Sequence, residues 1–268
     1  MSTLSVRRAT PHDLNELVRD APDIVAELTD DHRRSLSARF RAVFASDHRR
    51  LDAWSVEQAG RASSGFRWSP ATARRLLGNA GLRRVVRDPL CAPTEAVTQE
   101  IDDQLLRCAS GYARTGSLAN WLGGLSGCEL ALVCAEATNW VVQVLEIAQG
   151  LDCEWRVAAS DAYYDVARAR TTLRARRDLD VPLEHGRVVL RVRSGSPGKS
   201  AGPGLRSDLT IDTLANHEGI AARRFIGVWP EAGVALSVDG TMADLRAGAR
   251  DLVRTAVVQE RLRYHNAA

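Results

Sequence analysis

The sequence predicts an α/β protein, in which a helical N-terminal region packs on a mixed sheet flanked by helices. Two observations support this prediction. Up to about residue 150, apolar residues such as Leu14, Leu17 and Val18 recur at the spacing of one helix face, whereas after Gly150 they alternate with polar residues as in strands. The second part also runs from strands to a helix and again from strands to a helix, which is typical of α/β or α+β folds.

Helices are expected over residues 30–45, 94–112 and 117–122. Ser69-Pro70 is a strong helix start, because Ser caps free backbone N–H groups and Pro fits the first helical turn. Gly78 and Gly81 are expected to end one short helix (71–77) and to precede another (82–86). Such a pair resembles a helix-turn-helix in outline only.

Residues 126–149 predict a long helix rich in Ala, Val and Leu, and a helix that is apolar on most sides should be the central buried helix of the fold. In the second part, alternation predicts strands over 171–181 and 187–193. A loop over 194–204, a helix over 208–216 capped by Ser207, strands over 223–229 and 234–238, and a helix over 242–264 follow. We expect a basic helical region at 1–90 and an α/β domain at 91–268.

The sequence also indicates the compartment. No run of 18 apolar residues is present, and residues 1–14 lack an apolar signal core, so neither a membrane-spanning helix nor secretion is expected. The five cysteines are odd in number and show no metal-binding spacing, which favours buried free thiols. The six histidines are scattered, so no zinc site is expected. We therefore expect a soluble, bacterial-type cytoplasmic protein.

Arginine dominates the basic residues, since the only lysine is Lys199, although the net charge is only +3. A GC-rich genome explains most of this excess. Residues 58–87 stand out, because they contain seven arginines and no acidic residue: Arg61, Arg67, Arg74, Arg75, Arg83, Arg84 and Arg87. This stretch, here called the arginine block, fits a surface that faces phosphates. A solvated helix face, or a face paired with the acidic middle of the chain, explains it equally well.

Two strand sequences resemble the motifs of a nuclease family. The first reads Ala175-Arg176-Arg177-Asp178, and the second reads Arg191-Val192-Arg193-Ser194-Gly195. Together with the element order over residues 126–260, they resemble the RecB-like branch of the PD-(D/E)XK nucleases. In that branch the first strand ends Gly-Arg-x-Asp and the second reads Asp-Tyr-Lys-Thr-Gly. The resemblance implies two metal-binding acids and a lysine that stabilises the transition state.

The chain departs from that pattern where catalysis depends on it. Asp178 stands at the first acidic position, but Arg191 replaces the second acid and Arg193 the lysine. An arginine repels a divalent ion and cannot act as a base. If the resemblance holds, the domain is a degenerate nuclease, and Arg191 and Arg193 would bind phosphate from the outer strand face.

Three functions are therefore expected in turn. The first is a non-catalytic nucleic-acid-binding protein, with DNA as the expected partner and no cofactor. Its contacts would come from Arg67, Arg74, Arg75, Arg83, Arg84, Arg87, Arg191 and Arg193. The second is a protein–protein interaction subunit or adaptor of a DNA repair or regulatory complex, with another protein or a second copy as partner. The third is an active nuclease that uses Asp178, Glu136 and Lys199 with Mg²⁺ or Mn²⁺.

Overall fold

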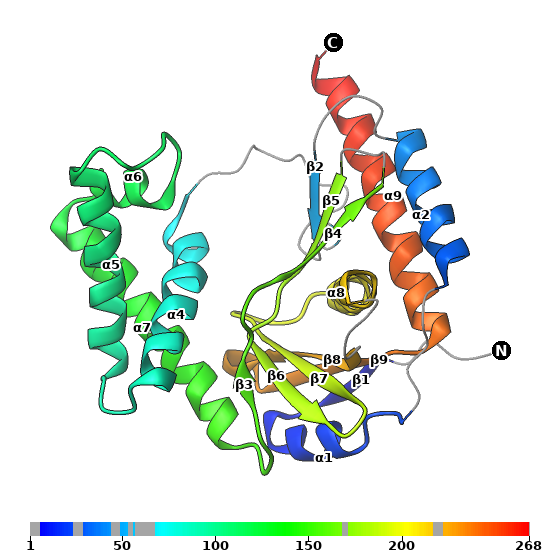
Figure 1. Cartoon of the computed structure of the whole chain (residues 1–268), viewed down its shortest axis with the longest axis horizontal. Helices are drawn as coiled ribbons and strands as arrows, with labels where there is room; N and C mark the ends of the chain where they lie inside the picture. The colour runs from blue at the N-terminus through cyan, green and yellow to red at the C-terminus, as the bar shows by residue number, and fades with distance from the viewer. Residues whose placement is uncertain are drawn as a thin grey trace. The chain divides into compact units, whose positions relative to one another are not determined.

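The computed structural model describes residues 6–23, 29–43, 49–52, 56, 68–167, 171–216 and 222–267 (Figure 1). The chain divides into two compact units: unit 1 comprises Met1–Ser63 and Gly150–Ala268, and unit 2 comprises Ser64–Gln149. This division differs from the expected one, because residue 90 falls inside unit 2. The first 63 residues instead supply strands and helices to unit 1.

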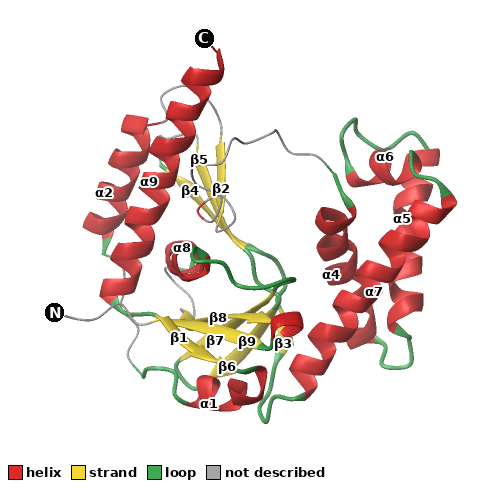
Figure 2. Cartoon of the chain, turned by 180° about the vertical axis from the view of Figure 1, so that it is seen from behind, coloured by secondary structure: helices red, strands yellow, loops and turns green. Residues whose placement is uncertain are grey.

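Unit 1 contains a mixed six-stranded sheet, which confirms the predicted α/β class (Figure 2). Only β7 and β8 pair in parallel, and the other neighbours are antiparallel. A helix, α8 (Ala201–Ala215), connects these two parallel strands. In sheet order the strands are β1 (Val6–Ala9), β9 (Val234–Asp239), β8 (Ala222–Trp229), β7 (Gly186–Val192), β6 (Leu179–Leu183) and β3 (Arg156–Val157).

A second sheet has three strands, β2 (Arg49–Asp52), β5 (Thr171–Ala175) and β4 (Ala162–Val166), in that order. β2 pairs with β5 in parallel, and β4 pairs with β5 antiparallel. Helix α8 lies between the two sheets and contacts both (Figure 1). Twelve of its fifteen residues are buried. The central buried helix of unit 1 is therefore α8.

The expected strand over 171–181 is two strands in different sheets. β5 ends at Ala175 and β6 begins at Leu179, so the chain changes sheets at Arg176 and Arg177. The carboxylate of Asp161 fixes this corner, because it accepts hydrogen bonds from the Arg174 side chain (2.8 Å) and from the backbone N–H of Arg177 (3.3 Å). Alternation alone does not reveal the corner, because it continues across both strands.

The expected 194–204 loop is also shorter than predicted, since α8 already begins at Ala201. Pro203 lies in its first turn, where a missing N–H costs no helical hydrogen bond. Ser207 is therefore inside the helix rather than at its start, and its hydroxyl donates to the carbonyl of Pro203 at 2.9 Å.

The remaining helices of unit 1 cover the sheets. α1 (Leu14–Arg19), preceded by the short 3-10 helix η1 (Pro11–Asp13), lies on the face of the large sheet opposite α8 (Figure 1). A second 3-10 turn, η2 (Pro230–Ala232), joins β8 to β9. α2 (Asp30–Val43) and α9 (Met242–Ala267) lie side by side (Figure 2). Leu36 and Phe40 of α2 are buried.

Unit 2 consists of α4 (Pro70–Arg87), α5 (Pro93–Ala109), α6 (Leu118–Gly123) and α7 (Gly127–Gln149). Ser69 caps α4 as predicted, since its hydroxyl accepts from the N–H of Thr72 at 3.3 Å. The expectation of two short helices was wrong, because α4 continues through Gly78 and Gly81. A Cβ at Gly78 would lie 2.5 Å from the Trp140 ring, and one at Gly81 would lie 2.9 Å from Val97. These glycines permit close helix packing rather than a turn.

The long helix α7 was expected to be buried on most sides, and this was wrong. Val133, Ala137, Trp140, Val141 and Val144 are buried, but Leu132 is 53% exposed. By length and composition α7 could also cross a membrane, although core helices of soluble proteins pass the same test. In the structure one side of α7 packs against α4 and α5, and 28% of its most apolar 18-residue window is buried.

Candidate functional site

Asp178, the acid that the nuclease resemblance retains, directly precedes β6 and lies beside β7. Its backbone N–H donates to the carbonyl of Leu190 at 3.0 Å, and its carboxylate accepts from the N–H of Val192 at 2.8 Å. The side chain is buried. Asp178 therefore ties the start of β6 to the end of β7.

Arg191 was expected on an outward strand face, and the structure shows that it is buried. Its guanidinium points toward α8 and forms an ion pair with Asp208 at 2.5 Å, with side-chain exposures of 5% and 0%. The expectation failed because α8 covers this face of β7. Arg191 is therefore unavailable as a nucleic-acid contact in this structure.

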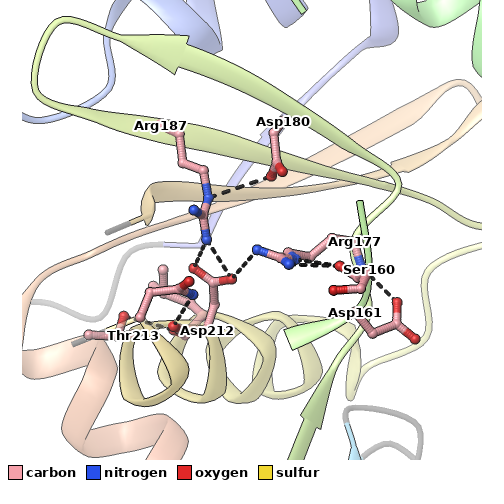
Figure 3. Close-up of polar contacts among 9 residues, drawn as sticks. Ser160, Asp161, Arg177, Asp180, Arg187, Asp212 and Thr213 are labelled. Carbon is pink, nitrogen blue, oxygen red and sulfur yellow. Dashed lines mark hydrogen bonds and ion pairs between the residues drawn. The ribbon is translucent and has the colours of Figure 1, made fainter. Parts of the chain in front are cut away.

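A second buried charge cluster lies one helical turn further along α8. Asp212 accepts two hydrogen bonds from Arg187 of β7, at 2.7 and 2.8 Å, and one from Arg177 at 3.4 Å (Figure 3). Arg187 also lies 3.5 Å from Asp180 of β6. Burial raises the pKa of Asp212, while the charges of Arg187 and Arg177 oppose that rise.

Asp208 and Asp212 are spaced four residues apart on α8, and their partners Arg191 and Arg187 are spaced four apart on β7. Residues four apart lie on one face of a helix, and on one face of a strand as well. Two carboxylates therefore enter the centre of unit 1, where arginines of the neighbouring strand β7 compensate their charge. A buried carboxylate without such a partner would be strongly disfavoured.

Arg193, at the position of the family's lysine, is half-buried. Its guanidinium carbon lies 4.9 Å from the centre of the Trp229 ring, within the range of a cation–π contact. The structure thus brings Asp178, Arg191 and Arg193 to the same end of the β6–β7 hairpin.

The other two residues of the nuclease hypothesis do not join this group in the described contacts. Lys199 is exposed in the loop before α8, and Glu136 lies on α7, in the other unit. Within the described ranges, no three His, Cys, Asp or Glu side chains are grouped as metal ligands.

Five residues of the arginine block lie on α4, and they have different environments. Arg84 faces α5 and pairs with Asp103 at 2.5 Å and with Glu100 at 3.4 Å. Arg87 is exposed, and Arg83, one turn earlier, is half-buried. Arg74 and Arg75 are also half-buried. Arg67 lies outside the described residues.

The pairing of Arg84 agrees with the alternative in which the block faces the acidic middle of the chain. The other arginines do not all share that environment, because Arg87 points to solvent. The start of α4 is held in place by Trp68, whose indole N–H donates to the carbonyl of Gly116 at 2.8 Å and whose ring stacks on Trp121. These contacts hold the start of α4 in place, so its exposed side chains project from a fixed helix.

Sequence reasoning missed Arg187, Asp208 and Asp212 as a functional group of charges. The signal was present, because two aspartates four residues apart in the otherwise uncharged segment 208–216 lie on one helix face and require partners where that face is buried. The sequence does not show that both sheets bury this helix. No protein family model and no curated protein matches this chain.

Proposed function

We propose that this chain is a cytoplasmic, non-catalytic nucleic-acid-binding protein that binds DNA, built on a degenerate RecB-like nuclease fold. The arrangement of β6, β7, α8 and β8 supports the family assignment. It contains an antiparallel hairpin, a helical crossover and a strand parallel to the second hairpin strand. This matches the later part of the order that the sequence resemblance implies, whose first element, the helix over 126–149, lies in unit 2.

The environment of Arg191 supports the absence of catalysis. A metal ion here would need a carboxylate at position 191, where a guanidinium stands instead. The nearby carboxylate of Asp208 is already paired with that guanidinium, and Asp178 accepts the N–H of Val192. These contacts give both carboxylates a structural role.

The observation that carries the binding proposal is α4, which has five arginines and no acidic residue over its 18 residues. Arg83 and Arg87 are four residues apart, so they lie on one side of the helix, away from the buried Leu77, Gly78 and Gly81. Arginine binds phosphate with two parallel hydrogen bonds, and clustered arginines attract the nucleic-acid backbone.

The test is fluorescence anisotropy with labelled duplex and single-stranded DNA over a series of salt concentrations. Binding should weaken steeply with salt. The Arg83→Gln/Arg87→Gln variant should reduce the slope of log K against log salt by about 2, since each phosphate contact contributes roughly one unit. Arg84→Gln is the matched control, because the Arg84 side chain faces α5, on another side of the helix, and should change the slope less. Absence of binding by the wild-type protein at low salt would remove the proposal.

Cleavage assays on the same DNA separate this proposal from the active-nuclease alternative. With Mg²⁺ or Mn²⁺, we expect the DNA to remain intact. Cleavage that disappears in a folded Asp178→Asn variant, and in Lys199→Gln or Glu136→Gln, would establish the nuclease alternative and contradict the loss of catalysis.

A second candidate function, a protein-interaction subunit, is favoured by exposed apolar side chains in unit 2. Leu76 and Val86 of α4 are each 43% exposed, and Leu132 of α7 is 53% exposed. Exposed apolar side chains mark a protein-binding site where they form one contiguous patch. Sedimentation velocity over a concentration series tests it. Self-association that Leu132→Asp abolishes, without affinity for DNA, would favour this function over the first.

A further inference from the structure

A pocket with a volume of about 500 Å³ lies between α2 and α9 in unit 1, away from the β6–β7 hairpin. Its apolar lining comes from Leu36 of α2, Leu214 at the end of α8, and Leu245 and Ala249 of α9. Pockets of this volume are typical of sites for small organic molecules and are larger than a simple ion requires.

The polar lining of the pocket is cationic. Arg39 projects from α2, and Arg246 and Arg250 project from successive turns of α9. His32 also lines the pocket, and its Nε2 lies 3.4 Å from the Arg246 guanidinium. No carboxylate is among the described residues that line it.

Acidic residues close to the pocket in sequence have partners elsewhere. Asp31 pairs with Arg34 at 2.5 Å, and Asp244 accepts a hydrogen bond from the Thr241 hydroxyl at 2.7 Å. Asp251 lies 3.7 Å from Arg206 of α8. The three arginines of the lining are therefore placed to attract an anion from solvent.

The walls of the pocket are held by contacts between the helices. Arg33 of α2 donates to the carbonyl of Leu214 at 2.7 Å, which fixes α2 on the end of α8. The Thr210 hydroxyl of α8 lies between two carbonyl acceptors, Arg206 of α8 at 2.8 Å and Leu245 of α9 at 3.1 Å, so it brings α9 close against α8. The pocket thus exists before any ligand binds, and preformed sites lose less free energy on ordering.

We propose that this pocket binds a nucleoside phosphate. Arg246 and Arg250 hold the phosphate, with Arg39 and His32 on the opposite wall. The base lies against Leu36 and the partly exposed Ala243 and Ala249 of α9. Arginine suits this task, because its planar, permanently charged group binds phosphate and stacks on aromatic rings. The inference goes beyond the DNA-binding proposal and does not depend on α4.

Isothermal titration calorimetry at physiological salt, with the full chain, tests this proposal. The ligands are adenosine 5′-monophosphate and guanosine 5′-monophosphate. The nucleoside adenosine and inorganic phosphate are titrated separately, as the two halves of a nucleotide. At least one nucleotide should bind at least tenfold more tightly than either half. The Arg246→Gln/Arg250→Gln variant should weaken binding at least tenfold, whereas Arg34→Gln, outside the pocket on α2, should leave it unchanged.

Ala249→Gln provides a second variant, because it fills the apolar part of the pocket without removing charge, and it should also weaken nucleotide binding. Circular dichroism confirms that each variant is folded. Absence of binding by both nucleotides, equal affinity for inorganic phosphate, or insensitivity to all pocket substitutions would overturn the proposal. DNA binding is also measured for the wild-type protein and for Arg246→Gln/Arg250→Gln. DNA binding that persists when nucleotide binding is absent or lost shows that the two proposals are independent.

Discussion

Arg191 of β7 and Asp208 of α8 form an ion pair at 2.5 Å, in the interior of unit 1. The pair occupies the place where the sequence resemblance expects a metal-binding acid. It also joins the crossover helix to the strand that precedes it. The same two elements are joined again through Arg187 and Asp212. The main effect of these two ion pairs is therefore on the stability of unit 1.

Removing one partner of this buried pair should be strongly destabilising. We expect Arg191→Met or Asp208→Leu to lower the free energy of unfolding by about 3–5 kcal/mol, because the other charge stays buried without compensation. The double variant Arg191→Met/Asp208→Leu should lose much less than the sum of the two. Urea denaturation in a double-mutant cycle measures this coupling. Additive losses would contradict it, and Arg34→Met, which breaks an exposed pair, is the control.

Gly248 of α9 should not tolerate a side chain. A Cβ there would overlap the Thr210 hydroxyl and the backbone carbonyl of Arg206, both on α8. Since backbone atoms cannot move aside readily, Gly248→Ala should destabilise the protein by about 1–3 kcal/mol. Thermal unfolding measures the change. Gly127→Ala, with no atom within 4 Å of the added Cβ, should be neutral or stabilising.

The stability of the start of α7 should depend on pH through the ionisation of Glu129. The pKa of Glu129 is lowered because its carboxylate accepts hydrogen bonds from the hydroxyl and then the backbone N–H of Ser126, at 2.7 and 2.8 Å. Ser126→Ala should therefore raise this pKa toward its ordinary value, as NMR titration can measure. A carboxylate with a lowered pKa stabilises the folded state above its unfolded pKa and loses this effect as pH falls through the folded pKa. The stability difference between variant and wild type should thus shrink in acid.

Cys153 should be a slow-reacting thiol although it is exposed. Partial desolvation of its thiol raises its pKa, and the charge of Asp152 adds to the effect while Arg19 opposes it. Asp152→Asn should lower this pKa and accelerate alkylation by iodoacetamide at pH 8. Peptide mass spectrometry resolves Cys153 from the other cysteines. An unchanged rate at Cys153, with the rate at Cys128 as reference, would show that Asp152 has no influence.

The sequence predicted the positions of the helices and strands better than it predicted what packs against each of them. Helix starts with local signals were confirmed at Ser69-Pro70, and the paired strands around Val188 and Ile226 lie where alternation indicates. Alternation says that a strand has two faces, but it does not say what covers each one. Arg191 was placed on a solvent face because α8, which covers it, begins seven residues earlier than its expected start at Asp208.

Helix packing also explains why two glycines that favour a helix end lie inside a helix. Gly78 and Gly81 favour a helix end by themselves, yet here Trp140 and Val97 pack into the space that they leave. The expectation of buried thiols failed for a related reason, since Cys128 lies on the exposed side of α7. The sequence located Asp178, Arg191 and Arg193 of the candidate site together. It did not identify their contacts with Val192, Asp208 and Trp229, because these are set by tertiary structure.

The pairing of β1 with β9 has a consequence for how the protein is made. Val6 lies opposite Val238, so β1 cannot pair with β9 until residue 238 has been synthesised. Unit 2, whose residues are contiguous, can form while that strand is still unpaired. An N-terminal edge strand without its neighbour is prone to pair with other chains. The interval before β9 is synthesised is therefore the time when β1 is most open to pairing with other chains.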